Sequence, residues 1–241
     1  MAPSARLLTC HVTHLTTRTL GIIGAGKVGT ALARLATAGG WAVTLSGSPR
    51  QPMQGLIVET LVPGARLLPE AEVVAGADIV VVAIPFGKAD SVDWAALSGK
   101  VVVDAMNYWY PVDGHVAAAD QFDGSTAEFT LSRNPAMRLV KSLNHLGYHD
   151  METDARPAGD PLRRSLVAAS DDAEARALVA GFIDDIGFDP VITGLADGVL
   201  LEPEGPVFGV ELSADAMISA LDGAHGAGTA LAVPEDELRV A

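Results

Sequence analysis

The chain has 241 residues, of which 49% are hydrophobic and 19% are charged. This length suits one large domain or a core domain with a small appendage, and the apolar fraction is too high for a disordered chain. No apolar run reaches the ~20 residues of a membrane span, and the formal net charge of −14 disfavours binding to nucleic acid.

Cysteine usage bears on the cellular location. Cys10 is the only cysteine, so a disulfide within the chain and a zinc cluster of cysteines are excluded. We expect a reducing, cytoplasmic environment on this ground. Residues 1–18 contain no long apolar stretch, and we expect a loose extension there and not a secretory signal.

The first half of the chain alternates short apolar runs with helical patterns. The runs predict strands at 19–23, 41–46, 66–68, 79–84 and 101–103, and the unbroken branched run at 79–84 is typical of a central parallel strand. Helices are predicted at 27–38, 54–62 and 88–97, with glycine or proline ending the first two.

The second half continues the alternation as far as residue 194. Ser125 and Glu128 resemble a capping box and predict a helix over 125–131. Strands are expected at 139–143, 166–169 and 189–193, and an amphipathic helix at 171–186. The pattern predicts an α/β fold, a Rossmann-type doubly wound and mostly parallel sheet. We therefore divide the chain into an extension at 1–18, a Rossmann domain at 19–194 and a C-terminal extension at 195–241.

A Gly-x-Gly-x-x-Gly motif follows the first predicted strand and opens the first predicted helix. In this context the first glycine allows a tight turn, the second lets a pyrophosphate approach the backbone, and the third lets the helix pack on the strand. The helix N-terminus then faces the phosphates. The motif predicts a dinucleotide site formed by Gly24, Ala25, Gly26, Lys27, Val28 and Gly29.

The segment after the second predicted strand indicates which dinucleotide binds. An NAD site usually has an Asp or Glu there for the ribose hydroxyls, whereas the first acid after Gly29 is Glu59. Small hydroxyl residues and an arginine suit the 2′-phosphate of NADP. We therefore predict NADP, held in part by Ser46, Gly47, Ser48 and Arg50.

Two later loops are expected at the nicotinamide half of the cofactor, because ligands of such sheets lie beyond the carboxyl ends of the strands. Ile84 and Pro85 follow the fourth predicted strand. Asn107 follows the fifth, where it would bind the nicotinamide ribose or a substrate, or else cap a local turn.

These segments together resemble a known family, the NADP oxidoreductases that depend on the deazaflavin coenzyme F420. The likeness covers about residues 19 to 208, including Val140-Lys141-Ser142-Leu143-Asn144 and Gly187-Phe188-Asp189-Pro190. The resemblance implies a hydride passing between NADPH and a deazaflavin stacked on the nicotinamide. It implies that residues 25–28 line the pyrophosphate, that Gly47, Ser48 and Arg50 hold the 2′-phosphate, and that Ile84 lies near the nicotinamide. One departure is Pro49, which separates the family's usual Ser-Arg pair.

Other functions stay open at this point. Lys141 and Asn144 would polarise a carbonyl in an NADPH-dependent reductase of a small carbonyl or imine, or would have only structural roles. A non-catalytic NADP sensor is a third hypothesis, since a fold does not determine a function. His145 and His149 have helical spacing, but Gly147 between them favours a loop, and we predict no metal site.

The C-terminal extension is the expected place for a partner. Its apolar residues exceed what a surface appendage needs, which favours a homodimer contact there. We predict otherwise only small-molecule partners, a cofactor and a substrate, with no nucleic acid and no membrane.

Overall fold

The computed structural model describes residues 17–48 and 53–226. Its eight strands form one sheet in the order β3-β2-β1-β4-β5-β6-β7-β8, which confirms the Rossmann-type α/β prediction. The strands are β1 (Thr19–Ile23), β2 (Ala42–Ser46), β3 (Arg66–Leu67), β4 (Ile79–Val82), β5 (Val101–Asp104), β6 (Arg138–Lys141), β7 (Ser165–Ala169) and β8 (Asp189–Thr193).

Strand direction changes once across the sheet. The first six strands are parallel. Leu20 of β1 lies opposite Ile79 of β4, and Val82 of β4 lies opposite Asp104 of β5. β7 is antiparallel to β6, and β8 is parallel to β7. The carboxyl ends of β1, β2, β4, β5 and β6 therefore lie at one edge, where parallel sheets bind ligands.

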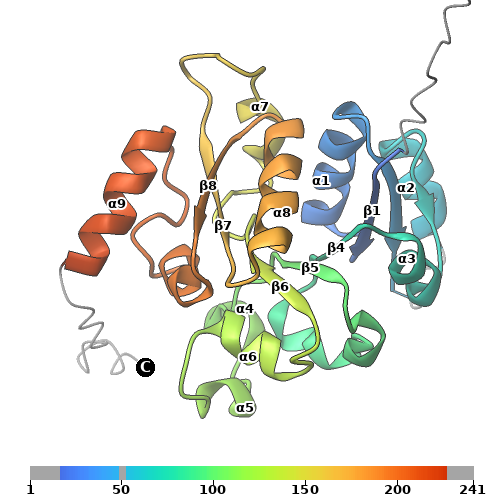
Figure 1. Ribbon diagram of the computed structural model, residues 1–241. Coiled ribbons are helices and arrows are strands. Elements are labelled where there is room, and N and C mark those ends of the chain that lie inside the picture. Colours follow the sequence, from blue (N-terminus) through green and yellow to red (C-terminus); the bar gives the residue numbers. More distant parts are fainter. Residues whose placement is uncertain (1–16, 49–52, 227–241) are drawn as a thin grey trace, which may run out of the picture.

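Helices cover both faces of the sheet (Figure 1). One face packs against α1 (Lys27–Ala38), α2 (Gln54–Leu61), α7 (Met151–Asp154) and α8 (Ala173–Asp185). The other packs against α3 (Glu70–Gly76), the 3-10 helices η1 (Phe86–Ser91) and η2 (Trp94–Leu97), and α6 (Thr126–Ser132). The short helices α4 (Tyr110–Asp113) and α5 (Ala117–Asp120) connect β5 to α6.

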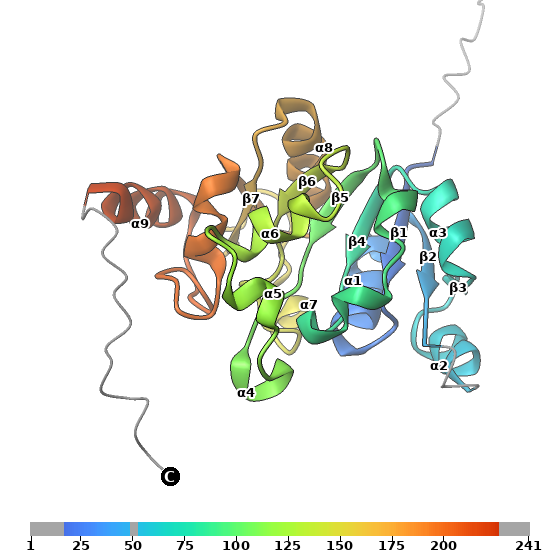
Figure 2. The same cartoon turned by 90° about the horizontal axis from the view of Figure 1, so that it is seen from below.

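The C-terminal part of the described chain is packed, and does not hang free. η3 (Leu195–Leu201) and α9 (Ala214–Gly226) form an apolar cluster with β7 and β8. The alternation of β7 explains this cluster, since Leu166 and Ala168 face α8 while Val167 and Ala169 face η3 and α9. Figure 2 shows α9 at one end of the molecule and α2 with β3 at the other.

Most predicted elements are confirmed, but the helix expected at 88–97 is wrong. The structure has η1 and η2 there, separated by Val92 in an extended conformation with φ −83° and ψ 135°. The side chain of Asp93 accepts a hydrogen bond from the N–H of Ala96 and so begins a new turn. The helices α3, α4, α5, α7 and α9 were not predicted, because most are too short to show a helical period.

Within the described residues, no helix is both long and apolar enough to cross a membrane.

Candidate functional site

The glycine turn lies between the ends of three strands. It starts directly after β1 at Gly24, whose φ of +118° few side chains tolerate. The N–H of Gly24 donates to the carbonyl oxygen of Ser46 at 3.0 Å, which ties the turn to the end of β2. A Cβ at Gly24 would lie 2.4 Å from the carbonyl oxygen of Ala83, after β4. Packing on both sides therefore requires glycine at this position.

The other two glycines of the motif have different surroundings. A Cβ at Gly29 would lie 1.9 Å from the carbonyl oxygen of Gly24. The close packing of α1 on the turn therefore requires glycine at position 29. A Cβ at Gly26 would have no atom within 4 Å, and Gly26 is exposed. No contact within the described chain demands glycine at position 26, so this position leaves room for a ligand to approach the backbone.

The surroundings of the glycine turn fit a pyrophosphate. Gly26 presents bare backbone to open space, and α1, which begins at Lys27, directs its first N–H groups to the same side. The ammonium group of Lys27 donates to the hydroxyl of Tyr148 at 3.1 Å and lies 5.2 Å from that ring's centre. Val28 is half-buried against the core.

The predicted 2′-phosphate loop begins at the end of β2. Ser46 is buried, Gly47 is half-buried and Ser48 is exposed. Arg50 lies outside the described residues, so its predicted role stays a prediction. Gln54, which the sequence analysis did not single out, bonds both to this loop and to the glycine turn.

Ile84 and Pro85 follow β4, and Ile84 lies beside the glycine turn, where its Cγ2 would be 2.9 Å from a Cβ at Gly24. The N–H of Ala83 donates to the carbonyl oxygen of Ile23 at 2.9 Å, which keeps the ends of β4 and β1 together. Ile84 is half-buried and Pro85 is exposed at the start of η1. This pair presents an apolar surface next to the predicted dinucleotide site.

Asn107 and Asn144 join the loops that follow β5 and β6. The side chain of Asn144 donates to Oδ1 of Asn107 at 3.0 Å and to the carbonyl oxygen of Leu201 at 2.7 Å. Asn107 donates in turn to the backbone carbonyl oxygen of Asn144 at 2.7 Å. The Oδ1 atom of Asn144 is buried and has no hydrogen-bond partner among the described residues. Asn107 therefore bonds to a neighbouring loop, a role that the sequence analysis did not consider.

Lys141 is enclosed by the protein. Its ammonium group donates to the carbonyl oxygen of Met106 at 2.6 Å and lies 3.4 Å from Oδ2 of Asp104, and both side chains are 0% exposed. Glu202 belongs to the same interior, where burial raises the pKa of its carboxyl although Lys141 opposes the shift. Lys141 cannot touch a substrate in this arrangement, so the structure favours its structural role over carbonyl polarisation.

The backbone between Lys141 and Asn144 is strained at Leu143. Its φ of +67° is the one positive value at a non-glycine residue among those described, and such a conformation is costly for a branched side chain. Leu143 is 1% exposed, so the surrounding core holds it there. The strained residue thus lies in the loop after β6, directly before Asn144.

The aromatic residues after Asn107 divide into packed and exposed side chains. Tyr108 stacks on Phe86 with ring centres 5.0 Å apart, and it donates to Asp120 at 2.5 Å. Trp109 and Tyr110 are more than half exposed. Asp113 holds this segment against the loop after β4, since its carboxylate accepts from the N–H groups of Gly87 and Trp109.

His145 and His149 do not form a metal pair. His145 is buried, its Nε2 accepts from the N–H of Val167, and burial lowers its pKa to about 3. His149 is exposed against the ring of Tyr148. No group of three metal-ligating side chains occurs in the part of the chain that the structure describes.

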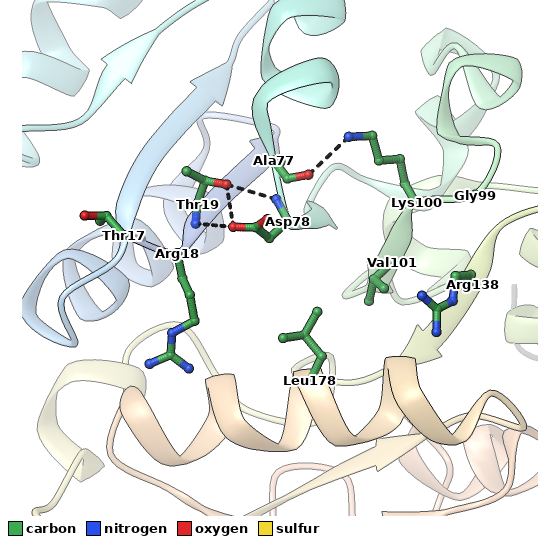
Figure 3. Close-up of a pocket in the computed structure, with 10 residues that line it drawn as sticks. All are labelled: Thr17, Arg18, Thr19, Ala77, Asp78, Gly99, Lys100, Val101, Arg138 and Leu178. Carbon is green, nitrogen blue, oxygen red and sulfur yellow. Dashed lines mark hydrogen bonds between the residues drawn. The ribbon is translucent and has the colours of Figure 1, made fainter. Parts of the chain in front are cut away.

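A separate cavity lies at the opposite edge of the sheet, at the amino ends of the strands. Its lining includes Arg18, Lys100, Arg138 and, from α8, Leu178 (Figure 3). Each arginine already pairs with a carboxylate, and Lys100 donates to backbone carbonyls of Ala75 and Ala77. Because it lies at the opposite edge of the sheet, this cavity is distinct from the predicted dinucleotide site.

Comparison with known proteins supports the assignment of the glycine turn. The model of the family "NADP oxidoreductase coenzyme F420-dependent" matches residues 19–108. The sequence matches no curated protein.

Solved structures of similar fold exist. A hypothetical protein from Sinorhizobium meliloti is 26% identical over 82% of this chain and 96% of its own, with a TM-score of 0.68. A protein assigned as an F420-dependent NADP reductase from Arthrobacter sp. FB24 is 25% identical over 75% of this chain and 86% of its own, with a TM-score of 0.60. An imine reductase from Myxococcus stipitatus is 18% identical and shares the fold (TM-score 0.53, 88% of this chain, 62% of its own).

Proposed function

We propose that the chain is a coenzyme F420-dependent NADP oxidoreductase, which transfers a hydride between NADPH and a deazaflavin, because the model of that family matches residues 19–108. The protein is an NADP-dependent oxidoreductase, and the deazaflavin acceptor is the proposed part. One observation carries the proposal: Gly24 and Gly29 are required by packing, while Gly26 faces open space beside the N-terminus of α1.

The residues of the turn and the β2 loop would bind the adenine-ribose half of the dinucleotide. Residues 25–28 and the first N–H groups of α1 bind the pyrophosphate, because backbone donors at a helix N-terminus favour an anion. Ser46, Gly47, Ser48 and Arg50 bind the 2′-phosphate, and no acid occurs between β2 and Glu59 to repel it.

The loops after β4 and β5 would line the nicotinamide half. Ile84 and Pro85 exclude water from one side, and Asn107 is held in place by Asn144. Bound NADPH and deazaflavin supply a hydride donor and acceptor, and the overall reaction consumes one proton with the hydride when the deazaflavin is reduced. The task of the chain is then to hold two rings in contact in a dry site, which needs positioning more than an acid or a base.

Direct assay tests this proposal. The protein is mixed with NADPH and the deazaflavin, and the absorbance of the deazaflavin is followed. Loss of its absorbance at the rate of NADPH oxidation is the expected result. If NADPH binds and no hydride moves, the acceptor proposal fails; oxidation of NADPH by small carbonyls or imines would instead establish a reductase, and binding without turnover would establish a sensor.

Assembly as a homodimer is part of the same proposal. Val210 is 41% exposed and Ile218 on α9 is 47% exposed, which leaves apolar surface in the C-terminal part. Light scattering of the purified protein measures the mass directly, and a monomer would contradict this part.

A further inference from the structure

Gln54 connects the two loops that the proposed function assigns to NADPH. It is the first residue of α2, and only 7% of its surface is exposed. Its Nε2 donates to the carbonyl oxygen of Ala25 at 3.0 Å, inside the glycine turn. Its Oε1 accepts from the N–H of Ser48 at 2.8 Å, in the loop after β2.

Gly47, directly after β2, lies close against this amide. A Cβ at Gly47 would lie 2.1 Å from Oε1 of Gln54, so any side chain there would displace the amide. Gly47 has no positive φ that would otherwise require glycine. The close approach of Gln54 is therefore the structural reason for glycine at position 47.

The chemistry of the link requires a neutral amide. One end must donate to a carbonyl and the other must accept from an N–H, which glutamine does and glutamate does not. A carboxylate here would face the carbonyl oxygen of Ala25 and would add negative charge beside the proposed 2′-phosphate loop. The backbone bond from Gly24 to Ser46 already joins the strand ends, so the bonds of Gln54 serve the loops beyond them.

We propose that Gln54 is a positioning residue that holds Ser48 and its loop against the glycine turn, and thereby sets the preference for NADPH over NADH. The inference rests on the proposed binding of NADPH. Gln54 acts on the cofactor through the loop, because its own polar atoms are engaged by Ala25 and Ser48.

Gln54→Met tests the link with little change in side-chain volume. Dissociation constants for NADPH and NADH are measured for the wild type and the variant by fluorescence titration. We expect the constant for NADPH to rise about tenfold, as the loss of net hydrogen-bond energy implies, and that for NADH to rise clearly less. Gln121→Ala, at an exposed glutamine after α5, is the matched control and should change neither constant.

Three further variants probe the same contact independently. Gln54→Glu should lose NADPH affinity more than Gln54→Met does, because it adds a negative charge. Introduced into the wild type, Gly47→Ala should also weaken NADPH binding. In a Gln54→Ala background, where the clashing Oε1 is gone, the same substitution should change NADPH affinity little. This double-mutant cycle isolates the contact between the two residues.

The outcomes separate this inference from the proposed function. A wild type that binds no NADPH refutes the proposed function itself. If the wild type prefers NADPH and Gln54→Met leaves the preference unchanged, the inference is overturned. Equal losses for both cofactors, with a lower melting temperature, would show a merely structural glutamine and would overturn it as well.

Discussion

Asn107 and Asn144 are bonded to each other in both directions across the carboxyl edge of β5 and β6. Asn144 donates from its side chain to Oδ1 of Asn107 at 3.0 Å, and Asn107 donates to the backbone carbonyl oxygen of Asn144 at 2.7 Å. The strained backbone at Leu143 precedes this pair. The loop after β5, which the proposed function assigns to the nicotinamide half, is thus joined to the loop after β6.

Asn144→Asp tests how much this connection contributes. The substitution keeps the shape but removes the donor to Asn107 and Leu201, and it leaves buried acceptors facing one another. We expect a loss of about 2–3 kcal/mol in the free energy of unfolding, measured in urea. Combination with Asn107→Ala should be less than additive, and full additivity would show that the two side chains are not coupled.

Gly26→Ala and Gly29→Ala should have different effects. The Cβ of alanine has free space at position 26 but would lie 1.9 Å from the carbonyl oxygen of Gly24 at position 29. We expect Gly26→Ala to melt close to the wild-type temperature while NADPH binding weakens at least tenfold. Gly29→Ala should lose both stability and binding. Undiminished NADPH binding by folded Gly26→Ala would contradict the placement of the pyrophosphate.

Arg50→Ala should separate the two dinucleotides. Removal of a charge that faces a phosphate costs about 1.5–3 kcal/mol, which is roughly tenfold to a hundredfold in affinity. We expect this loss for NADPH and a much smaller one for NADH, measured by titration at fixed ionic strength. Equal losses would refute the assignment of Arg50 to the 2′-phosphate.

Lys141→Met should act on stability. The variant leaves the carboxylate of Asp104 buried without its cation, and breaking such a pair costs about 3–5 kcal/mol. The double variant Asp104→Asn with Lys141→Met removes both charges and should recover much of this loss in urea unfolding. If the double variant is stable but has lost the activity with small carbonyls that the wild type shows, Lys141 takes part in catalysis after all.

His145 should make the stability depend on pH. Burial, with Arg164 and Lys141 nearby, lowers its pKa from 6.5 to about 3. Between these values the unfolded chain binds a proton that the folded chain does not, so stability falls as the pH falls below 6.5, by up to about 1.4 kcal/mol per unit.

His145→Gln removes this dependence while it keeps an acceptor for the N–H of Val167. The slope of the unfolding free energy between pH 6 and pH 5 should decrease by about 1 kcal/mol per unit relative to the wild type. His149→Gln, at an exposed histidine, is the control and should retain the wild-type slope. An unchanged slope in His145→Gln would show that His145 is accessible to protons.

The sequence by itself determined the strands of an α/β fold and predicted a dinucleotide site, because both inferences depend on local patterns. Strand periodicity, the spacing of three glycines and the missing acid after β2 are properties of neighbouring residues. The same local rules failed at 88–97, where Asp93 and the extended Val92 divide the expected helix.

Only the tertiary structure decided which polar residues face the site and which are buried. From the sequence, Lys141 is a possible catalytic group. In the structure its ammonium group contacts Met106 and Asp104, which lie at the end of β5 and in the loop after it. Gln54 carried no signal in the sequence, since its partners lie 29 residues before it and six residues before it in the chain. Contacts between segments distant in the chain depend on how the strands are ordered in space, and no local pattern of residues records that order.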